Sequence, residues 1–130
     1  MLPAESRMRQ RRDFTAAVRR GSRSGRKLLT GHLLVLPAGA AGEAGAAGGD
    51  CPPRAGFVVS RAVGIAVVRN RVRRRLRVLV REYLSSLPRG SLLVVRAHPQ
   101  AATASQADLA AELGLVMSTL VRRQAGALRR

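Results

Sequence analysis

GIAVVRNRVRRRLRVLVREYL is the sequence from Gly64 to Leu84, and it contains seven arginines but a single acid, Glu82. At about 100° per residue, the stretch forms a helix with two unlike sides. The apolar stripe consists of Val68, Val72, Leu76, Leu79 and Tyr83. The basic side consists of Asn70, Arg71, Arg73, Arg74, Arg77 and Arg81, with Arg69 and Arg75 at its borders. We therefore expect one side of this helix to cover a hydrophobic core and the other to meet a polyanion.

The whole chain is strongly basic. Its 130 residues include 24 Lys and Arg against 7 Asp and Glu, which gives a net charge of +17. Apolar residues make up 46%, enough for one core, so we expect residues 1–130 to form a single domain. A surface helix held by ion pairs is the alternative interpretation of residues 64–84, but seven arginines with one acid cannot all be paired. A nucleic acid is therefore the expected partner.

Elements outside this helix follow from shorter patterns. A first helix is expected around residues 13–18, ended by Gly21, and residues 21–27 are expected to form a loop. Apolar runs predict strands within residues 28–36, 54–61 and 91–96. Ser105 is expected to cap a final helix. The apolar positions of that helix are Leu109, Leu113, Val116, Met117 and Leu120.

The order of these elements is helix, strand, strand, helix, strand, helix, with a possible extra short strand near residues 58–63. It predicts a small α+β sandwich of αβββαβα type, with helices packed on one small mixed sheet. Residues 38–53 are rich in Ala and Gly and are expected to form a flexible loop. The basic tail at 124–130 is expected to fray.

The sequence offers little chemistry of its own. His32 and His98 are isolated, so they are interpreted as solvated or core histidines rather than ligands, and the single Cys51 forms neither a disulfide nor a metal site. No nucleophile with a partner base and no paired carboxylates are present, so we expect no catalytic residue. No membrane span and no secretion signal are expected, which predicts a cytoplasmic protein.

The alternative of an amphipathic protein that lies on a membrane surface is disfavoured, because the apolar stripe of residues 64–84 is narrow and the strands need it as a cover. No small-molecule substrate is expected either, since no glycine-rich phosphate loop is present. A macromolecular anion therefore stays the expected ligand.

The stretch Ser60–Arg77, SRAVGIAVVRNRVRRRLR, resembles the signature of the bacterial ribonuclease P protein component. That family carries the pattern Ser-Lys-Lys-x-Gly-x-Ala-Val-x-Arg-Asn-Arg-x-Lys-Arg-x-x-Arg. The Arg-x-x-Asp-Phe segment ending at Phe14, the strand Leu92–Arg96 and the final helix follow in the family's order. Two departures stand out: Ile65 leaves the helix without an evident cap, and Val78 places an apolar side chain on the basic side.

The resemblance implies a single RNA-binding domain that works as the accessory protein subunit of an endoribonuclease. In such a ribonucleoprotein the catalytic RNA removes the 5′ leader of precursor tRNA with magnesium ions held by the RNA, and the protein itself binds no cofactor. By motif, the residues facing the catalytic RNA would be Arg69, Asn70, Arg71, Arg73, Arg74 and Arg77. The leader would lie in a cleft between the first helix and the sheet.

The resemblance also assigns a lining to that leader cleft, which would consist of Phe14, Ala17, Val18, Leu33, Leu36 and Phe57. Further basic contacts would come from Arg11, Arg12 and Arg61. A ribosomal or ribosome-assembly subunit that binds another RNA is the alternative.

Overall fold

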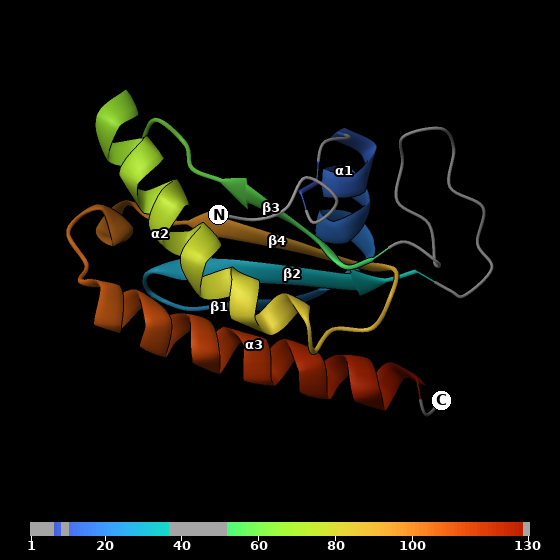
Figure 1. Ribbon diagram of the computed structural model, residues 1–130. Coiled ribbons are helices and arrows are strands. Elements are labelled where there is room, and N and C mark those ends of the chain that lie inside the picture. Colours follow the sequence, from blue (N-terminus) through green and yellow to red (C-terminus); the bar gives the residue numbers. More distant parts are fainter. Residues whose placement is uncertain (1–6, 9–10, 37–51, 129–130) are drawn as a thin grey trace.

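The computed structural model describes residues 7–8, 11–36 and 52–128, and it shows an α+β fold in which helices cover both faces of one sheet (Figure 1). The elements in chain order are α1 (Arg11–Arg20), β1 (Ser22–Gly25), β2 (Leu29–Val35), β3 (Arg54–Val58), α2 (Ala66–Leu84), β4 (Ser91–Ala97), the 3₁₀ helix η2 (Pro99–Ala102) and α3 (Gln106–Leu128). The predicted αβββαβα order is confirmed.

The four strands form a mixed sheet in the order β1-β2-β4-β3. β2 pairs antiparallel with β1 and β4, whereas β3 and β4 are parallel and α2 provides the crossover between them. A crossover of this kind is what parallel neighbours need. Beside β3, an isolated parallel bridge joins Arg7 to Ala55, and the Met8 amide donates to the Ala55 carbonyl oxygen at 2.9 Å.

Side-chain alternation along the strands separates two hydrophobic clusters. On one face α2 and α3 bury Leu29, Leu33, Leu93 and Val95 of the sheet. On the other face α1 covers a smaller cluster, in which Met8, Ala17, Leu92 and Val94 are buried and Phe14, Leu34, Leu36 and Val58 pack against them. The positions predicted for the apolar side of the final helix are all buried in the larger cluster. Each such side chain contributes about 1.5–3 kcal/mol to folding.

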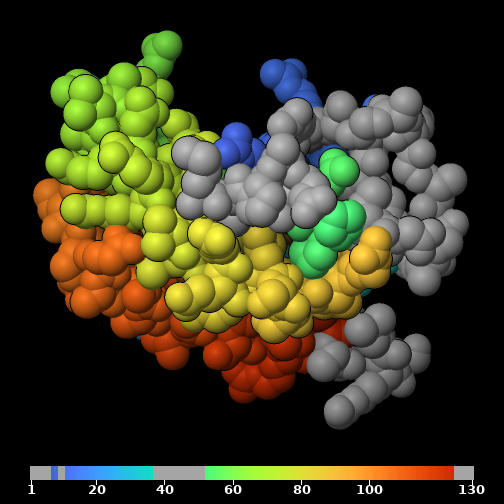
Figure 2. Space-filling view, viewed as in Figure 1, coloured from blue at the N-terminus to red at the C-terminus, as the bar shows by residue number. Residues whose placement is uncertain are grey.

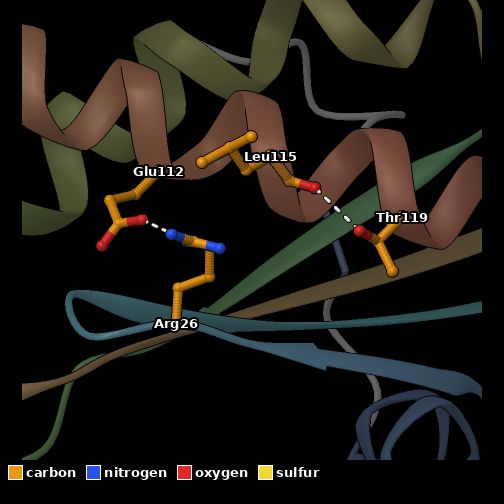
Figure 3. Close-up of polar contacts among 4 residues, drawn as sticks. All are labelled: Arg26, Glu112, Leu115 and Thr119. Carbon is orange, nitrogen blue, oxygen red and sulfur yellow. Dashed lines mark hydrogen bonds and ion pairs between the residues drawn. The ribbon is translucent and has the colours of Figure 1, made fainter.

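α3 lies close against the sheet because Gly31 has no side chain. A Cβ at that position would lie 2.6 Å from Val116 and 2.9 Å from Leu120. Beyond this contact, Arg26, which follows β1, forms an ion pair with Glu112 of α3, as Figure 3 shows. The Ser105 hydroxyl accepts a hydrogen bond from the Asp108 amide at 3.0 Å, so the predicted cap of α3 is confirmed.

The apolar stripe of α2 is centred differently from the prediction. Val72, Leu76, Val80 and Leu84 are its buried residues, and Val68, Leu79 and Tyr83 pack at its edge. Val80 and Leu84 are not part of the predicted stripe, yet both are buried. These four buried residues follow one another at intervals of four along the helix. The helix packs against both β3 and α3. Ile65 occupies the N-cap position with no side-chain hydrogen bond, as expected.

Two local predictions were wrong. Residues 22–25, expected to be a loop, form β1, since backbone pairing with β2 holds them although none is strongly apolar. Residues 58–63 add no strand: β3 ends at Val58, and the Val63 amide donates to Ser60 within a turn. The loop predicted at 38–53 lies outside the described residues except for its last two prolines. α3 remains helical to Leu128, and fraying of the tail stays a prediction.

Candidate nucleic-acid interface

The basic side of α2 divides into two flanks with different neighbours. On one flank, Arg75 Nη1 donates to the Ala104 carbonyl oxygen at 3.2 Å, and Arg71 Nη2 lies 3.5 Å from the Ala102 carbonyl oxygen. These two arginines therefore reach the connection between η2 and α3. Arg74 is exposed, and no hydrogen bond or ion pair joins its side chain to another described residue.

The other flank of α2 faces the edge of the sheet. Arg73 and Arg77 line a narrow groove there, together with Arg7, Met8, Phe14, Ala55, Gly56 and Phe57. Arg73 Nη1 also donates to Asn70 Oδ1 at 2.9 Å, which orients both side chains. Burial, followed by the charges of Arg7 and Arg73, lowers the pKa of Arg77. Arginine remains protonated in proteins, so Arg77 is a partly buried cation with two further guanidinium groups close by.

All six residues predicted to face the catalytic RNA thus lie on one helix and along its basic side. Asn70, Arg71 and Arg74 are exposed, whereas Arg69, Arg73 and Arg77 are half-buried. Arg69 Nε is enclosed without a hydrogen-bond partner. Figure 2 shows the side chains of α2, coloured green to yellow, on the front surface above the orange side chains of α3. Val78 lies among the arginines and is exposed, as expected.

The predicted cleft residues do not gather in one place. Ala17 is fully buried on the side of α1 that packs against the sheet. Leu33 is also buried and faces α3, because Leu29, Gly31 and Leu33 alternate onto that side of β2. Leu33 therefore lies on the face of the sheet opposite α1, and its assignment to the cleft lining was wrong, whereas that of Ala17 stays a prediction.

The other four cleft residues remain at least partly accessible. Phe57 is half-buried and packs against the cluster on the α2 side of the sheet. Phe14 and Leu36 are half-buried on the α1 side, where the Phe14 ring lies against Gly56. Val18, near the end of α1, is 47% exposed. Of the further basic residues, Arg11, Arg12 and Arg61 are all exposed, the first two on α1 and the third in the turn after β3.

A second groove, which sequence reasoning missed, opens on the α1 face of the sheet. We call it the basic groove. It is lined by Val18, Arg23, Thr30, His32, Ser60, Arg96, Ala97, His98 and Pro99. Strand register brings them together: Arg23 lies opposite His32, and Thr30 lies opposite Arg96. The two histidines looked isolated because they are far apart in the chain. The pairing of β2 with β4 brings both of them to the lining of this groove.

The ring nitrogens in the basic groove have distinct surroundings. His98 Nε2 and the Thr30 hydroxyl share a hydrogen bond of 2.7 Å. His32 is 8% exposed, and its Nδ1 is enclosed without a partner. Burial, followed by the charges of Arg23 and Arg96, lowers the pKa of His32. The imidazole is therefore neutral near physiological pH, and the residues of the groove's lining include no acid.

The described residues hold neither a cluster of potential metal ligands nor a helix suited to a membrane. Within residues 7–8, 11–36 and 52–128, no three His, Cys, Asp or Glu side chains lie close enough to hold a metal ion. No helix of that part of the chain is both long and apolar enough to cross a membrane.

The sequence was then compared with protein families. The family model for ribonuclease P matches residues 2–121. The chain belongs to the ribonuclease P protein family. Among curated relatives, the ribonuclease P protein component of Streptomyces bikiniensis is 55% identical over 122 residues, which cover 93% of this chain and 96% of the relative. The component of Thermobifida fusca is 52% identical over 122 residues, covering 94% and 80%.

Solved structures of ribonuclease P proteins share the fold. The protein from Staphylococcus aureus superposes with a TM-score of 0.69 over 88% of this chain and 94% of its own, at 18% identity. The protein from Thermotoga maritima gives 0.64 over 89% and 96%, at 22% identity. The architecture of the ribonuclease P protein family is therefore retained here, although most side chains differ from those two structures.

Proposed function

We propose that this protein is the accessory subunit of a ribonuclease P ribonucleoprotein. It binds the catalytic RNA through α2 and holds the 5′ leader of precursor tRNA on the α1 face of the sheet. The RNA, with magnesium ions that it holds, cleaves the leader from the tRNA. The protein contributes affinity and position and no reacting group.

The observation that carries this proposal is the basic side of α2. Arg69, Asn70, Arg71, Arg73, Arg74 and Arg77 lie along one helix, and Glu82 is the only acid of that helix. Guanidinium groups fork onto phosphate oxygens, and each contact releases counterions from the nucleic acid. Burial, followed by the charges of Arg7 and Arg73, lowers the pKa of Arg77. A phosphate backbone along α2 balances these positive charges.

Residues on the α1 face of the sheet support the proposed position of the leader. Phe14, Val18 and Leu36 supply apolar contact there, and the basic groove starts at Val18. Because α2 and the basic groove lie on opposite faces of one sheet, the protein can contact two RNAs at once. It thereby screens the repulsion between the catalytic RNA and its substrate, so less magnesium is needed.

The test is reconstitution with a catalytic RNA of the family and a precursor tRNA. Adding the protein should increase cleavage at the 5′ position at low magnesium concentration, and the increase should shrink as magnesium is raised. A triple variant with Arg73, Arg74 and Arg77 changed to Gln should bind the catalytic RNA more weakly and with a smaller salt dependence. If the protein bound ribosomal RNA tightly but left cleavage unchanged, the alternative of a ribosomal or ribosome-assembly subunit would replace the proposal.

A further inference from the structure

The outer side of α3 differs in charge from the rest of the molecule. The chain carries 24 Lys and Arg, yet none lies between Arg96 and Arg122, where the only acids are Asp108 and Glu112. Glu112 is engaged in the ion pair with Arg26. In Figure 1, α3 runs along one side of the molecule, and its outer side is turned away from the sheet. Along this stretch, α3 offers a nucleic acid no cation of its own.

Small and apolar side chains occupy this side of the helix. We call it the outer face of α3, and it consists of the exposed residues Ala107, Ala111, Leu115 and Ser118. They recur at intervals of three or four residues and therefore form one row along the helix. Leu115 is 50% exposed, and Val121 beside the row is 46% exposed. Alanine and serine let a second helix approach closely, and Leu115 gives the row an apolar centre.

One charge of each sign lies at the ends of the row. Asp108 and Arg122 are both exposed, and they lie on the same side of α3 about four turns apart. The distance along the helix axis is about 21 Å, so the two side chains of one copy cannot pair with each other. An antiparallel second α3 would place an arginine opposite each Asp108 and a carboxylate opposite each Arg122. A parallel one would place like charges together, which is unfavourable.

We propose that the outer face of α3 binds a second copy of this chain, as an antiparallel helix pair around a two-fold axis at Leu115. Leu115 then contacts the same residue of the other copy, and the ion pair between Asp108 and Arg122 forms twice, because a two-fold contact is self-complementary. The contact spans only about four turns of helix, which is less than a standard interface of about 800 Å² per partner. We therefore expect a weak dimer, with a dissociation constant of about 10–100 µM.

Salt distinguishes this contact from binding of a nucleic acid. Two copies that each carry a net charge of +17 repel one another, and the Debye length falls from about 8 Å at 0.15 M to about 3 Å at 1 M salt. The exposed ion pairs weaken as well, but such pairs contribute little. The dimer should therefore become about tenfold tighter in 1 M salt, whereas affinity for RNA falls as salt rises.

Sedimentation equilibrium of the full-length protein without RNA tests the proposal. In about 1 M salt, a monomer–dimer equilibrium should appear between about 5 and about 500 µM protein. L115E should raise the dissociation constant more than about tenfold, because it places two carboxylates face to face at the two-fold axis. The matched control is V67E, at a residue of α2 that is 71% exposed, which changes the net charge equally and should leave the dimer intact.

Two results of this measurement would overturn the proposal. A protein that stays monomeric over the whole range has no such contact, and a different protein becomes the candidate occupant of the outer face of α3. A dimer that L115E leaves intact is held together by another surface. Because no RNA is present, neither result bears on the proposed function.

Charge reversal tests the antiparallel orientation. D108R alone and R122D alone each bring like charges together at both ends of the row, so each should dimerise about tenfold more weakly. In an equal mixture, a D108R copy and an R122D copy have opposite charges facing at both ends, so the mixed dimer should regain about the affinity of the unmodified protein. An unfolded variant could not be rescued by mixing. A mixture that dimerises no better than either variant alone would rule out the antiparallel pair.

Discussion

Arg75 donates a hydrogen bond from Nη1 to the carbonyl oxygen of Ala104 across 3.2 Å, and this contact ties the basic helix α2 to the chain that leads into α3. The neighbouring Arg74 is exposed and makes no such contact with the described residues. Two adjacent arginines on one helix thus have different surroundings. One is engaged with the protein's own backbone, and the other is available to a partner.

This difference predicts unequal effects of the same substitution at the two positions. R75Q should lower the free energy of unfolding by about 1 kcal/mol, because a partly buried hydrogen bond from a charged donor is lost. R74Q should change stability by less than about 0.5 kcal/mol, as surface substitutions usually do. Urea denaturation measures both effects.

For affinity to the catalytic RNA, R74Q should have the larger effect and R75Q the smaller one. R74Q should weaken binding about threefold to tenfold and reduce the salt dependence by about one counterion, whereas R75Q should change both much less. Equal losses of affinity in the two variants would mean that RNA competes with Ala104 for Arg75.

Much of the fold could be predicted, because the relevant elements carry strong patterns of their own. α3 buries the five apolar residues that its spacing predicted, and the cap at Ser105 is present. β1 could not be predicted, because Ser, Arg and Gly have no tendency to form strands. β1 forms because its backbone pairs with the edge of β2. Pairing with another segment leaves no pattern in the sequence of β1 itself.

The candidate site was predictable only where it lies on one helix. The basic side of α2 follows from periodicity, and the resemblance to the family motif selected six residues on or beside it. The basic groove depends on which residues of β1, β2 and β4 lie opposite one another, and strand register is not visible in a run such as residues 28–36. Leu33 was misplaced for the same reason, since a shift by one residue moves a side chain to the other face.

Gly56 and Phe14 provide a test of how α1 docks on the sheet. A Cβ at position 56 would lie 2.3 Å from Phe14 Cζ and 3.2 Å from Met8 Cβ, so G56A should cost about 1–3 kcal/mol of stability through overpacking. The smaller side chain in F14L should relieve the clash. The double variant should therefore lose less than the sum of the two single losses, as a double-mutant cycle of urea denaturation would reveal.

A glycine in another strand serves as the control for this pair. A Cβ at Gly25 would meet only Thr30, at 3.3 Å and 3.9 Å, so G25A should be close to neutral. Strict additivity of G56A and F14L, or an equal loss in G25A, would show that the contact between Phe14 and Gly56 does not limit packing.

The missing cap of α2 predicts a stabilising substitution. Ile65 is 72% exposed, and its φ of −68° and ψ of 168° are those that a capping residue adopts. I65S should place a hydroxyl within reach of the free amides of the first turn and raise the free energy of unfolding by about 1 kcal/mol. The matched control is V67S, at a residue 71% exposed but inside the helix, where serine should be neutral or slightly destabilising. Similar effects of both substitutions would contradict a capping role.

His32 predicts how stability depends on pH. Its pKa is lowered in the folded protein by burial and by Arg23 and Arg96, whereas the unfolded chain has the ordinary value of about 6.5. Between the two values the unfolded state binds more protons, so the free energy of unfolding should fall as the pH drops through about 6.5 and level off below the folded pKa. H32Q should remove this component, so the difference in stability between H32Q and the unmodified protein should shift in favour of H32Q as the pH falls from about 8 to about 5. Chemical denaturation across that range measures it, and a difference that stays constant with pH would show that the His32 ring titrates normally in the folded protein.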